Sequence, residues 1–119
     1  MAIHNDLGRL GESLAVGYLL ENNYVILERN WRFHKAEIDI IAKKEAQIII
    51  VEVKTRNSNF FGDPQSFVSP EKIKLLLKAA NHYLVSNNIA LEARFDILAI
   101  IKNKSTQEIT HFKDAFYHF

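Results

Sequence analysis

The residues of this sequence best suited to chemistry are an acid and a base, Glu52 and Lys54, which follow the most apolar stretch of the chain, residues 46–51. β-branched residues dominate that stretch, which predicts a strand in the interior of a sheet. Because side chains alternate across a sheet, Glu52 and Lys54 should share one face with Ile48 and Ile50. A charged pair at the end of a buried strand costs on the order of several kcal/mol unless the groups satisfy each other or bind something else. The pair therefore marks a candidate site.

A second acid, Asp39, comes from the preceding predicted strand and is expected to lie across a hairpin from this pair. If the hairpin loop spans residues 44–47, then Lys43 pairs with Ile48 and Asp39 lies directly opposite Glu52. Opposed residues of an antiparallel pair have Cβ atoms about 4.5–5.5 Å apart, so two like charges there repel unless a cation or a proton separates them. A shift of one residue in register would move Asp39 to the other face.

The ligand atoms of this group suit a hard divalent ion. The chain has no cysteine, which excludes a thiolate zinc site, and the carboxylates of Asp39 and Glu52 favour Mg²⁺ or Mn²⁺. With the backbone carbonyl of Val53 in reach, such an ion would lower the pKa of bound water, and Lys54 would orient that water or stabilise developing charge. These roles suit hydrolysis of a phosphodiester bond. From the residues alone, an ordinary surface ion-pair cluster is the alternative.

Length and composition indicate a single domain over residues 1–119. With 48% hydrophobic and 24% charged residues, the chain has the balance of an ordinary globular protein. No apolar leader and no membrane-spanning run is evident, so we expect a cytoplasmic protein without a membrane partner. A net charge of +1 does not indicate a nucleic-acid binder, so any basic surface must be local.

Hydrophobic periodicity predicts an α/β fold with elements in the order αβββαββ. The first helix should begin at Asn5 or Asp6 and run to about Leu20, and within it the spacing alone favours Glu12 as a glutamate at the edge of the buried face. A second helix should be capped by Ser69 and end at residues 87–88. The expected strands cover residues 24–28, 37–42, 46–56, 94–101 and 108–112.

Three further segments have aromatic side chains. Residues 29–35 interleave basic side chains, among them Arg32 and Lys35, with two aromatic ones. This pattern suits a phosphate backbone with stacked bases, and it suits equally an edge strand whose aromatics pack inward and whose cations face water. The polar loop at residues 57–64 contains two phenylalanines and could close over a ligand, although an ordinary connection is the default. The aromatic tail at residues 116–119 should pack on the domain or on a partner chain.

Together these motifs resemble those of the YraN-like family of small bacterial proteins. The resemblance covers nearly the whole chain and rests on Gly8-x-x-Gly11-Glu12-x-x-Ala15, Glu37-Ile38-Asp39-Ile40-Ile41-Ala42, Val51-Glu52-Val53-Lys54-Thr55-Arg56, Phe61-Gly62 and Arg94-Phe95-Asp96. That family is in turn similar to the PD-(D/E)XK nuclease superfamily, which has a restriction-endonuclease-like core of a mixed β-sheet flanked by helices. Its functional relatives include Holliday-junction resolvases, which are homodimers that use two divalent ions.

The resemblance also implies roles for individual residues. Asp39, Glu52 and Lys54 match the active-site residues of the superfamily, and Glu12 matches a glutamate that resolvase-like members supply from the first helix. By the same resemblance, the phosphate contacts would include Arg56 and Lys72. Arg32 and Lys35 are further candidates for binding nucleic acid, and Glu37 is a supporting acid.

Three functions remain open at this point. The leading one is a metal-dependent DNA nuclease that acts on branched DNA, forms a homodimer and needs no organic cofactor. The alternative is a non-catalytic nucleic-acid-binding module of a repair, recombination or DNA-uptake complex, and the weakest is a structural protein. The near-neutral charge favours the last two, whereas the full set of Glu12, Asp39, Glu52 and Lys54 favours the first.

Overall fold

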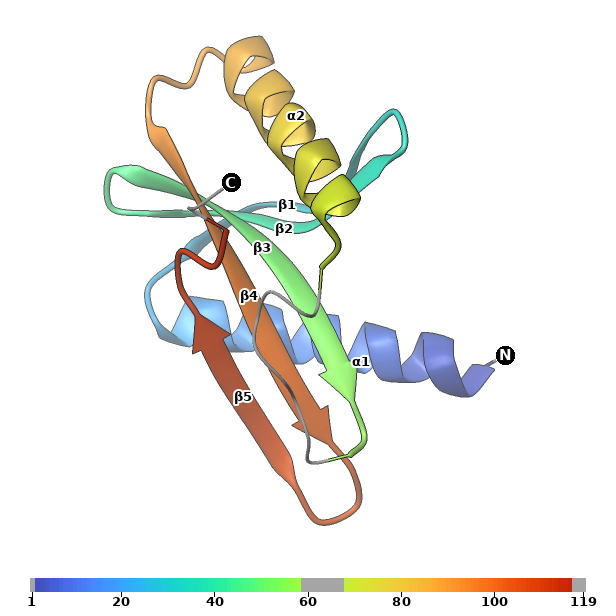
Figure 1. Cartoon of the computed structure of the whole chain (residues 1–119). Coiled ribbons are helices and arrows are strands. Elements are labelled where there is room, and N and C mark those ends of the chain that lie inside the picture. Colours follow the sequence, from blue (N-terminus) through green and yellow to red (C-terminus); the bar gives the residue numbers. More distant parts are fainter. Residues whose placement is uncertain (1, 59–67, 117–119) are drawn as a thin grey trace.

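A five-stranded mixed sheet with a helix on each face forms the body of the computed structural model, which describes residues 2–58 and 68–116 (Figure 1). Residues 59–64 of the polar loop, which include both of its phenylalanines, and residues 117–119 of the aromatic tail lie outside these ranges. The elements are α1 (Ala2–Glu21), β1 (Val25–Phe33), β2 (Ala36–Lys44), β3 (Gln47–Arg56), α2 (Pro70–Ser86), β4 (Glu92–Lys102) and β5 (Gln107–Phe112). Their order confirms the predicted αβββαββ arrangement.

The strands lie in the sheet in the same order as in the sequence, with β1 and β5 at the edges. Neighbouring strands are antiparallel except for β3 and β4, which are parallel and are connected through α2. A parallel pair requires such a crossover because the chain must return to the same end of the sheet. As a result α2 packs on one face, while α1 crosses the other face behind β3 and β4 (Figure 1).

Alternating side chains of β3 divide the core into two layers, as predicted. Ile48 and Ile50 pack beneath α2, and Ile49 and Val51 pack against α1. The helices contribute Ile73, Leu76, Ala79, Ala80 and Tyr83 from α2, and Ala15 and Leu19 from α1. Glu52 is the next residue of β3 whose side chain points toward α2.

The start of α2 follows from its capping residues. Ser69 has extended backbone geometry, and its side-chain oxygen accepts a hydrogen bond from the backbone N–H of Lys72 at 3.2 Å. Pro70 occupies the first turn, Glu71 complements the helix dipole there, and Asn87 caps the other end. The predicted helix is thus confirmed, and its cap fixes Lys72 in the turn nearest β3. Neither helix of the described part is long and apolar enough to cross a bilayer.

The β2–β3 hairpin has the predicted register with a shorter loop. Lys43 pairs with Ile48, but Lys44 also pairs with Gln47, so the turn consists of residues 45–46 only, with a left-handed φ of 53° at the first of them. The expected four-residue loop is wrong. The register is nevertheless the predicted one, because the two outer residues of that loop, Lys44 and Gln47, pair with each other. The ladder ends one pair before Asp39 and Glu52.

The basic and aromatic segment at residues 29–35 belongs mostly to edge strand β1. Trp31 and Phe33 are half-buried against the core layer beneath α2, whereas Arg29 and Arg32 are exposed. This confirms the edge-strand interpretation for those four residues. At the other end of the chain, Phe116 is buried with its ring 6.1 Å from that of Phe95, so this part of the tail packs on the domain.

Candidate active site

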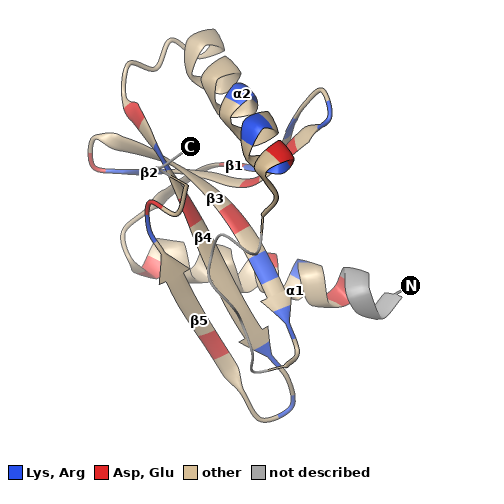
Figure 2. Cartoon of the chain, viewed as in Figure 1, with Lys and Arg blue, Asp and Glu red and all other residues tan. Residues whose placement is uncertain are grey.

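Glu52 is the centre of the candidate site, and two lysines from different elements contact its carboxylate. Its side chain is only 4% exposed, although it is charged. The Nζ of Lys72, from the first turn of α2, lies 2.5 Å from Glu52 Oε2, and the Nζ of Lys54, from β3, lies 3.5 Å from the same oxygen. Figure 2 shows the acidic and basic positions that follow each other along β3, and the basic positions at the start of α2. The predicted pairing of Glu52 with Lys54 on one face is therefore present.

Asp39 lies beside Glu52, where β2 and β3 part. Its Oδ2 accepts a hydrogen bond of 2.8 Å from the backbone N–H of Val53. Burial and the negative charge of Glu52 raise the pKa of Asp39 to about 7, and Glu12 adds to this, while the Val53 hydrogen bond and the charge of Lys72 act in the opposite direction. Three acids and one lysine thus interact electrostatically at this point of the sheet.

A break in the alternation of β2 turns Asp39 toward Val53. Ile38 packs in the layer beneath α2 and Ile40 in the layer against α1, although both have even numbers and would share a face in a regular strand. Asn30, opposite Asp39 in the β1–β2 register, has a φ of 52°, a left-handed conformation that asparagine tolerates. A regular strand would place Glu37, Asp39 and Ile41 on one face, and this alternation is interrupted because both strands change faces at this step.

Glu12 reaches the site through a close contact between α1 and β3. Gly11 is buried, and a Cβ at this position would overlap the side chain of Thr55. Because glycine allows the helix backbone this close to the strand, the next residue, Glu12, is half-buried near the end of β3. Its negative charge contributes to the raised pKa of Asp39.

The donor set suits a hard cation in its chemistry. Within residues 2–58 and 68–116, no three His, Cys, Asp or Glu side chains are grouped closely enough to hold a metal ion. Glu52 Oε2 instead contacts Lys72, so a cation that binds Glu52 must compete with this ammonium group. The carboxylates of Asp39, Glu52 and Glu12 are nevertheless the oxygen ligands that Mg²⁺ and Mn²⁺ prefer, and their mutual repulsion favours a bound cation.

The predicted nucleic-acid contacts fall into two groups. Lys35, at the β1–β2 turn, lines a cavity of about 320 Å³ together with Glu37 and Lys72, so these three residues are brought together beside Glu52. Arg32 is an exposed neighbour that forms an ion pair with Glu37 at 3.6 Å. Arg56 is exposed at the C-terminal end of β3, past Lys54, and does not line this cavity.

Sequence reasoning missed a second buried acid, Asp96, on the sheet face that contacts α1. Its carboxylate accepts hydrogen bonds from Arg94 Nε at 2.9 Å and Nη2 at 2.7 Å, and from the backbone N–H of Asp114 at 3.0 Å. His111 Nε2 lies 2.7 Å away, and its Nδ1 lies 3.0 Å from the hydroxyl of Tyr18. Burial favours a higher pKa for Asp96, but the hydrogen bonds from His111, Arg94 and Asp114 hold it below its ordinary value. This network joins β4, β5 and α1.

The family described as "Uncharacterised protein family UPF0102" matches residues 11–100. That range contains Glu12, Asp39, Glu52, Lys54 and Lys72. A UPF0102 protein of Flavobacterium psychrophilum is 60% identical over 119 residues, which cover the whole of both chains. One from Christiangramia forsetii is 54% identical over the full length of both, and one from Bacteroides thetaiotaomicron is 45% identical over 98% of this chain and 97% of the relative.

Proposed function

The chain belongs to the uncharacterised bacterial family UPF0102, and from the geometry of its site we propose that it is a divalent-metal-dependent DNA nuclease that hydrolyses phosphodiester bonds. The observation that carries the proposal is the buried Glu52 carboxylate, which contacts Lys54 and Lys72 and lies beside Asp39. A structural ion pair needs one acid and one base, whereas here Glu52 contacts lysines from β3 and α2, and Asp39 of β2 and Glu12 of α1 add negative charge at the same place.

Each of these residues has a task in the proposed reaction. Asp39 and Glu52 would hold the metal, and Glu12 would add its negative charge from α1; when bound, the metal supplies Lewis acidity and activates water. The N–H of Val53 orients Asp39, and the Lys54 ammonium stabilises negative charge that develops on the phosphoryl oxygens. The resemblance of these positions to the PD-(D/E)XK superfamily supports the assignment and favours branched DNA as the substrate.

A non-catalytic DNA-binding module is the second candidate function. The Lys72 ammonium already neutralises part of the charge of Glu52, which is the arrangement expected if the site binds phosphate through lysines alone. The net charge of +1 also limits the affinity that the whole surface can supply. The nuclease requires the acids for cleavage, whereas the binding module does not require them for binding DNA.

Cleavage of single-stranded, duplex, flap and four-way-junction DNA in Mg²⁺ or Mn²⁺ tests the proposal. We expect Glu52→Gln and Lys54→Ala each to lower the cleavage rate by about 100-fold or more, because each removes a group that acts on the transition state. Glu108→Gln and Lys104→Ala change exposed residues of β5 and the β4–β5 turn and should cleave like the wild type. Absence of cleavage at stoichiometric protein with either ion contradicts the nuclease, and intact DNA binding in that case supports the module.

A further inference from the structure

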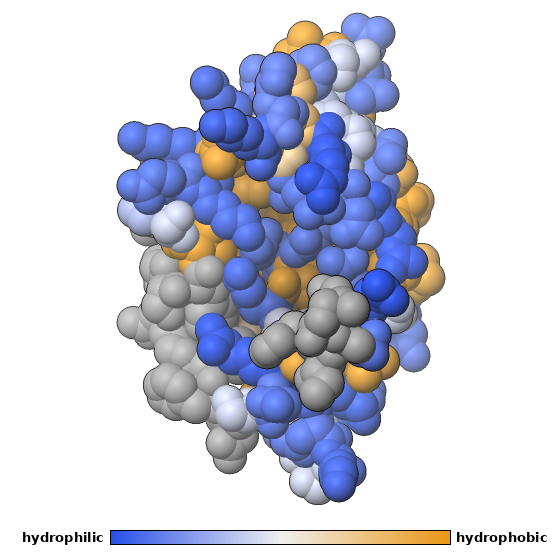
Figure 3. All heavy atoms as spheres, turned by 90° about the vertical axis from the view of Figure 1, so that its right-hand side faces the viewer, coloured by the Kyte–Doolittle hydropathy of each residue, from blue (hydrophilic) through white to orange (hydrophobic). Residues whose placement is uncertain are grey.

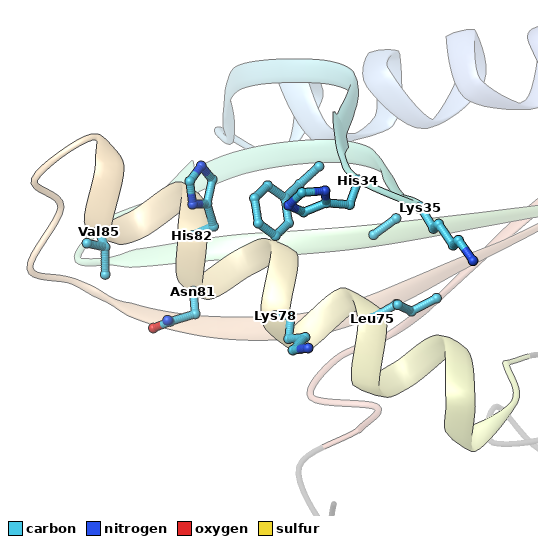
Figure 4. Close-up of a pocket in the computed structure, with 9 residues that line it drawn as sticks. His34, Lys35, Leu75, Lys78, Asn81, His82 and Val85 are labelled. Carbon is cyan, nitrogen blue, oxygen red and sulfur yellow. The ribbon is translucent and has the colours of Figure 1, made fainter.

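A pocket of about 700 Å³ lies between the β1–β2 turn and the outer side of α2, next to the candidate active site (Figure 4). Its volume is within the usual range for small-molecule and cofactor sites. From its lining we propose that this pocket binds an unpaired nucleobase, so that the substrates of the enzyme are DNAs with a single-stranded segment beside the scissile phosphate. The inference rests on the proposed function for the link to cleavage, but the base site can be tested without it.

Stacked aromatic rings form one wall of the pocket. The rings of Phe33 and His82 are 4.1 Å apart and inclined by only 19°, and His34 packs edge-on against Phe33 at 4.3 Å. Both histidines are exposed and lie near the middle of the pocket in Figure 4. The ring of His82 also lies 6.3 Å from that of Trp31, inclined by 27°, but His82 remains exposed, so a further planar ring can stack on its exposed part. Stacking on such rings is how proteins hold unpaired bases of any sequence.

The charges around these rings favour an anionic ligand. Lys35 lies toward one end of the pocket and Lys78 lies along α2, and among the described residues no carboxylate lines the pocket. Leu75 adds an apolar surface. A nucleotide combines the two properties that this lining selects, because it presents a flat apolar ring together with a negatively charged phosphate.

The pocket adjoins a smaller cavity on the side of the candidate active site, whose lining includes the acids Glu37 and Glu71 as well as Lys72. The smaller cavity that contains Lys72 shares Lys35, Ala36 and Leu75 with it, and the Nζ of Lys72 lies 2.5 Å from Glu52. On the face of the molecule that carries the β1–β2 turn, hydrophilic side chains surround a recessed apolar area (Figure 3). A strand whose phosphate lies at Lys72 can therefore place a nearby base between the turn and α2. A base within a duplex is stacked between its neighbours and must leave the helix first, so the pocket selects unpaired DNA.

Fluorescence of 2-aminopurine tests the base site directly, because this base analogue loses emission when it stacks on an aromatic ring. Single-stranded oligonucleotides with the analogue at successive positions would be titrated with the full chain in EDTA, which prevents cleavage. We expect quenching at a restricted set of positions in the wild type. His82→Ala should remove the quenching and weaken binding by about 5- to 150-fold, whereas His82→Phe should retain both.

Controls separate this proposal from its competitors. Lys78→Ala should weaken binding, and Lys104→Ala, an exposed lysine of the β4–β5 turn, should not. The base site is overturned if His82→Ala binds and quenches like the wild type, or if it instead changes the sedimentation of the free protein, which would make the pocket an interface between two copies. Quenching without any cleavage contradicts the nuclease and leaves the base site standing. Cleavage that is unaffected by His82→Ala contradicts the base site and leaves the nuclease standing.

Discussion

Glu52 and Asp96 are the two buried acids of the described chain, and their partners suit them to different tasks. The partners of Glu52 are lysines whose side chains are 31% and 40% exposed, so their flexible stems can move aside when a cation or phosphate arrives. Asp96 contacts the planar groups of Arg94 and His111, which are 17% and 7% exposed. A carboxylate held by planar, largely covered donors stabilises the architecture, whereas one held by flexible, partly exposed lysines remains available for binding.

The pH dependence of stability should reveal the role of Asp96. Its pKa is lower in the folded protein than in the unfolded chain, so its contribution to the free energy of unfolding is complete above the unfolded pKa and is lost as the pH falls through the folded pKa. Asp96→Asn should lower the free energy of unfolding at neutral pH by about 3 kcal/mol, because it leaves the half-buried Arg94 without its counter-ion. Asp39 acts in the opposite sense, because its raised pKa makes stability fall as the pH rises from about 4 to about 7.

Urea unfolding of the wild type and Asp96→Asn between about pH 2 and about pH 7 measures this effect. The difference between the two proteins should shrink toward acid pH, where the native carboxylate also takes up a proton. Glu108→Gln, on the exposed side of β5, serves as the control and should follow the wild-type profile. A constant difference between wild type and Asp96→Asn at every pH would contradict the assignment.

At the scale of elements, the contact of α1 with β3 depends on the missing side chain of Gly11. Gly11→Ala should lower the free energy of unfolding by about 1–2 kcal/mol, because the overlap with Thr55 exceeds the gain in helix propensity. Gly17→Ala is the matched control, since a Cβ there meets no atom within 4 Å, and it should raise stability by about 0.5–1 kcal/mol.

A double substitution identifies the clash. Thr55→Ala removes two of the three atoms that the new Cβ would meet, so it should recover part of the stability lost in Gly11→Ala. Chemical denaturation of Gly11→Ala, Thr55→Ala, the double variant and Gly17→Ala provides the measurement. Equal stability changes for Gly11→Ala and Gly17→Ala would mean that α1 shifts away from β3 at no cost.

Local rules predicted the elements well and their irregularities poorly. Alternation and turn chemistry placed Ile48 and Ile50 on one face with Glu52, and the cap at Ser69 fixed the start of α2. The left-handed conformation of Asn30 could not be predicted, because many asparagines adopt ordinary backbone angles. Its place opposite Asp39, where β1 and β2 change faces, follows only from the register of the two strands.

The partners of buried acids were predictable only within a strand. Arg94 and Asp96 are two residues apart in an apolar strand, so the argument that singled out Glu52 and Lys54 would have singled them out too. The contacts of Asp96 with His111 and of Glu52 with Lys72 join residues from different elements. They depend on the β4–β5 register and on how α2 packs over the sheet, and no local pattern encodes either.

At the scale of the whole molecule, charge is nearly balanced, with 15 Lys and Arg against 14 Asp and Glu. A surface of this kind does not attract DNA over long distances, so binding must come from a local set of cations. The set that surrounds the candidate site and the neighbouring pocket consists of Lys35, Lys54, Lys72 and Lys78. Shape and base stacking should therefore contribute more to the free energy of DNA binding than the net charge of the protein does.

The salt dependence of binding tests how local this recognition is. If these four lysines supply the phosphate contacts, the logarithm of the association constant for single-stranded DNA should fall with the logarithm of salt concentration with a slope of about −2 to −3. Lys78→Ala should make that slope shallower by about 0.7, and Lys104→Ala should leave it unchanged. Fluorescence anisotropy in EDTA provides the measurement. A slope steeper than about −5 would require cations beyond this set, and the DNA would then have to extend across the molecule past the pocket and the candidate site.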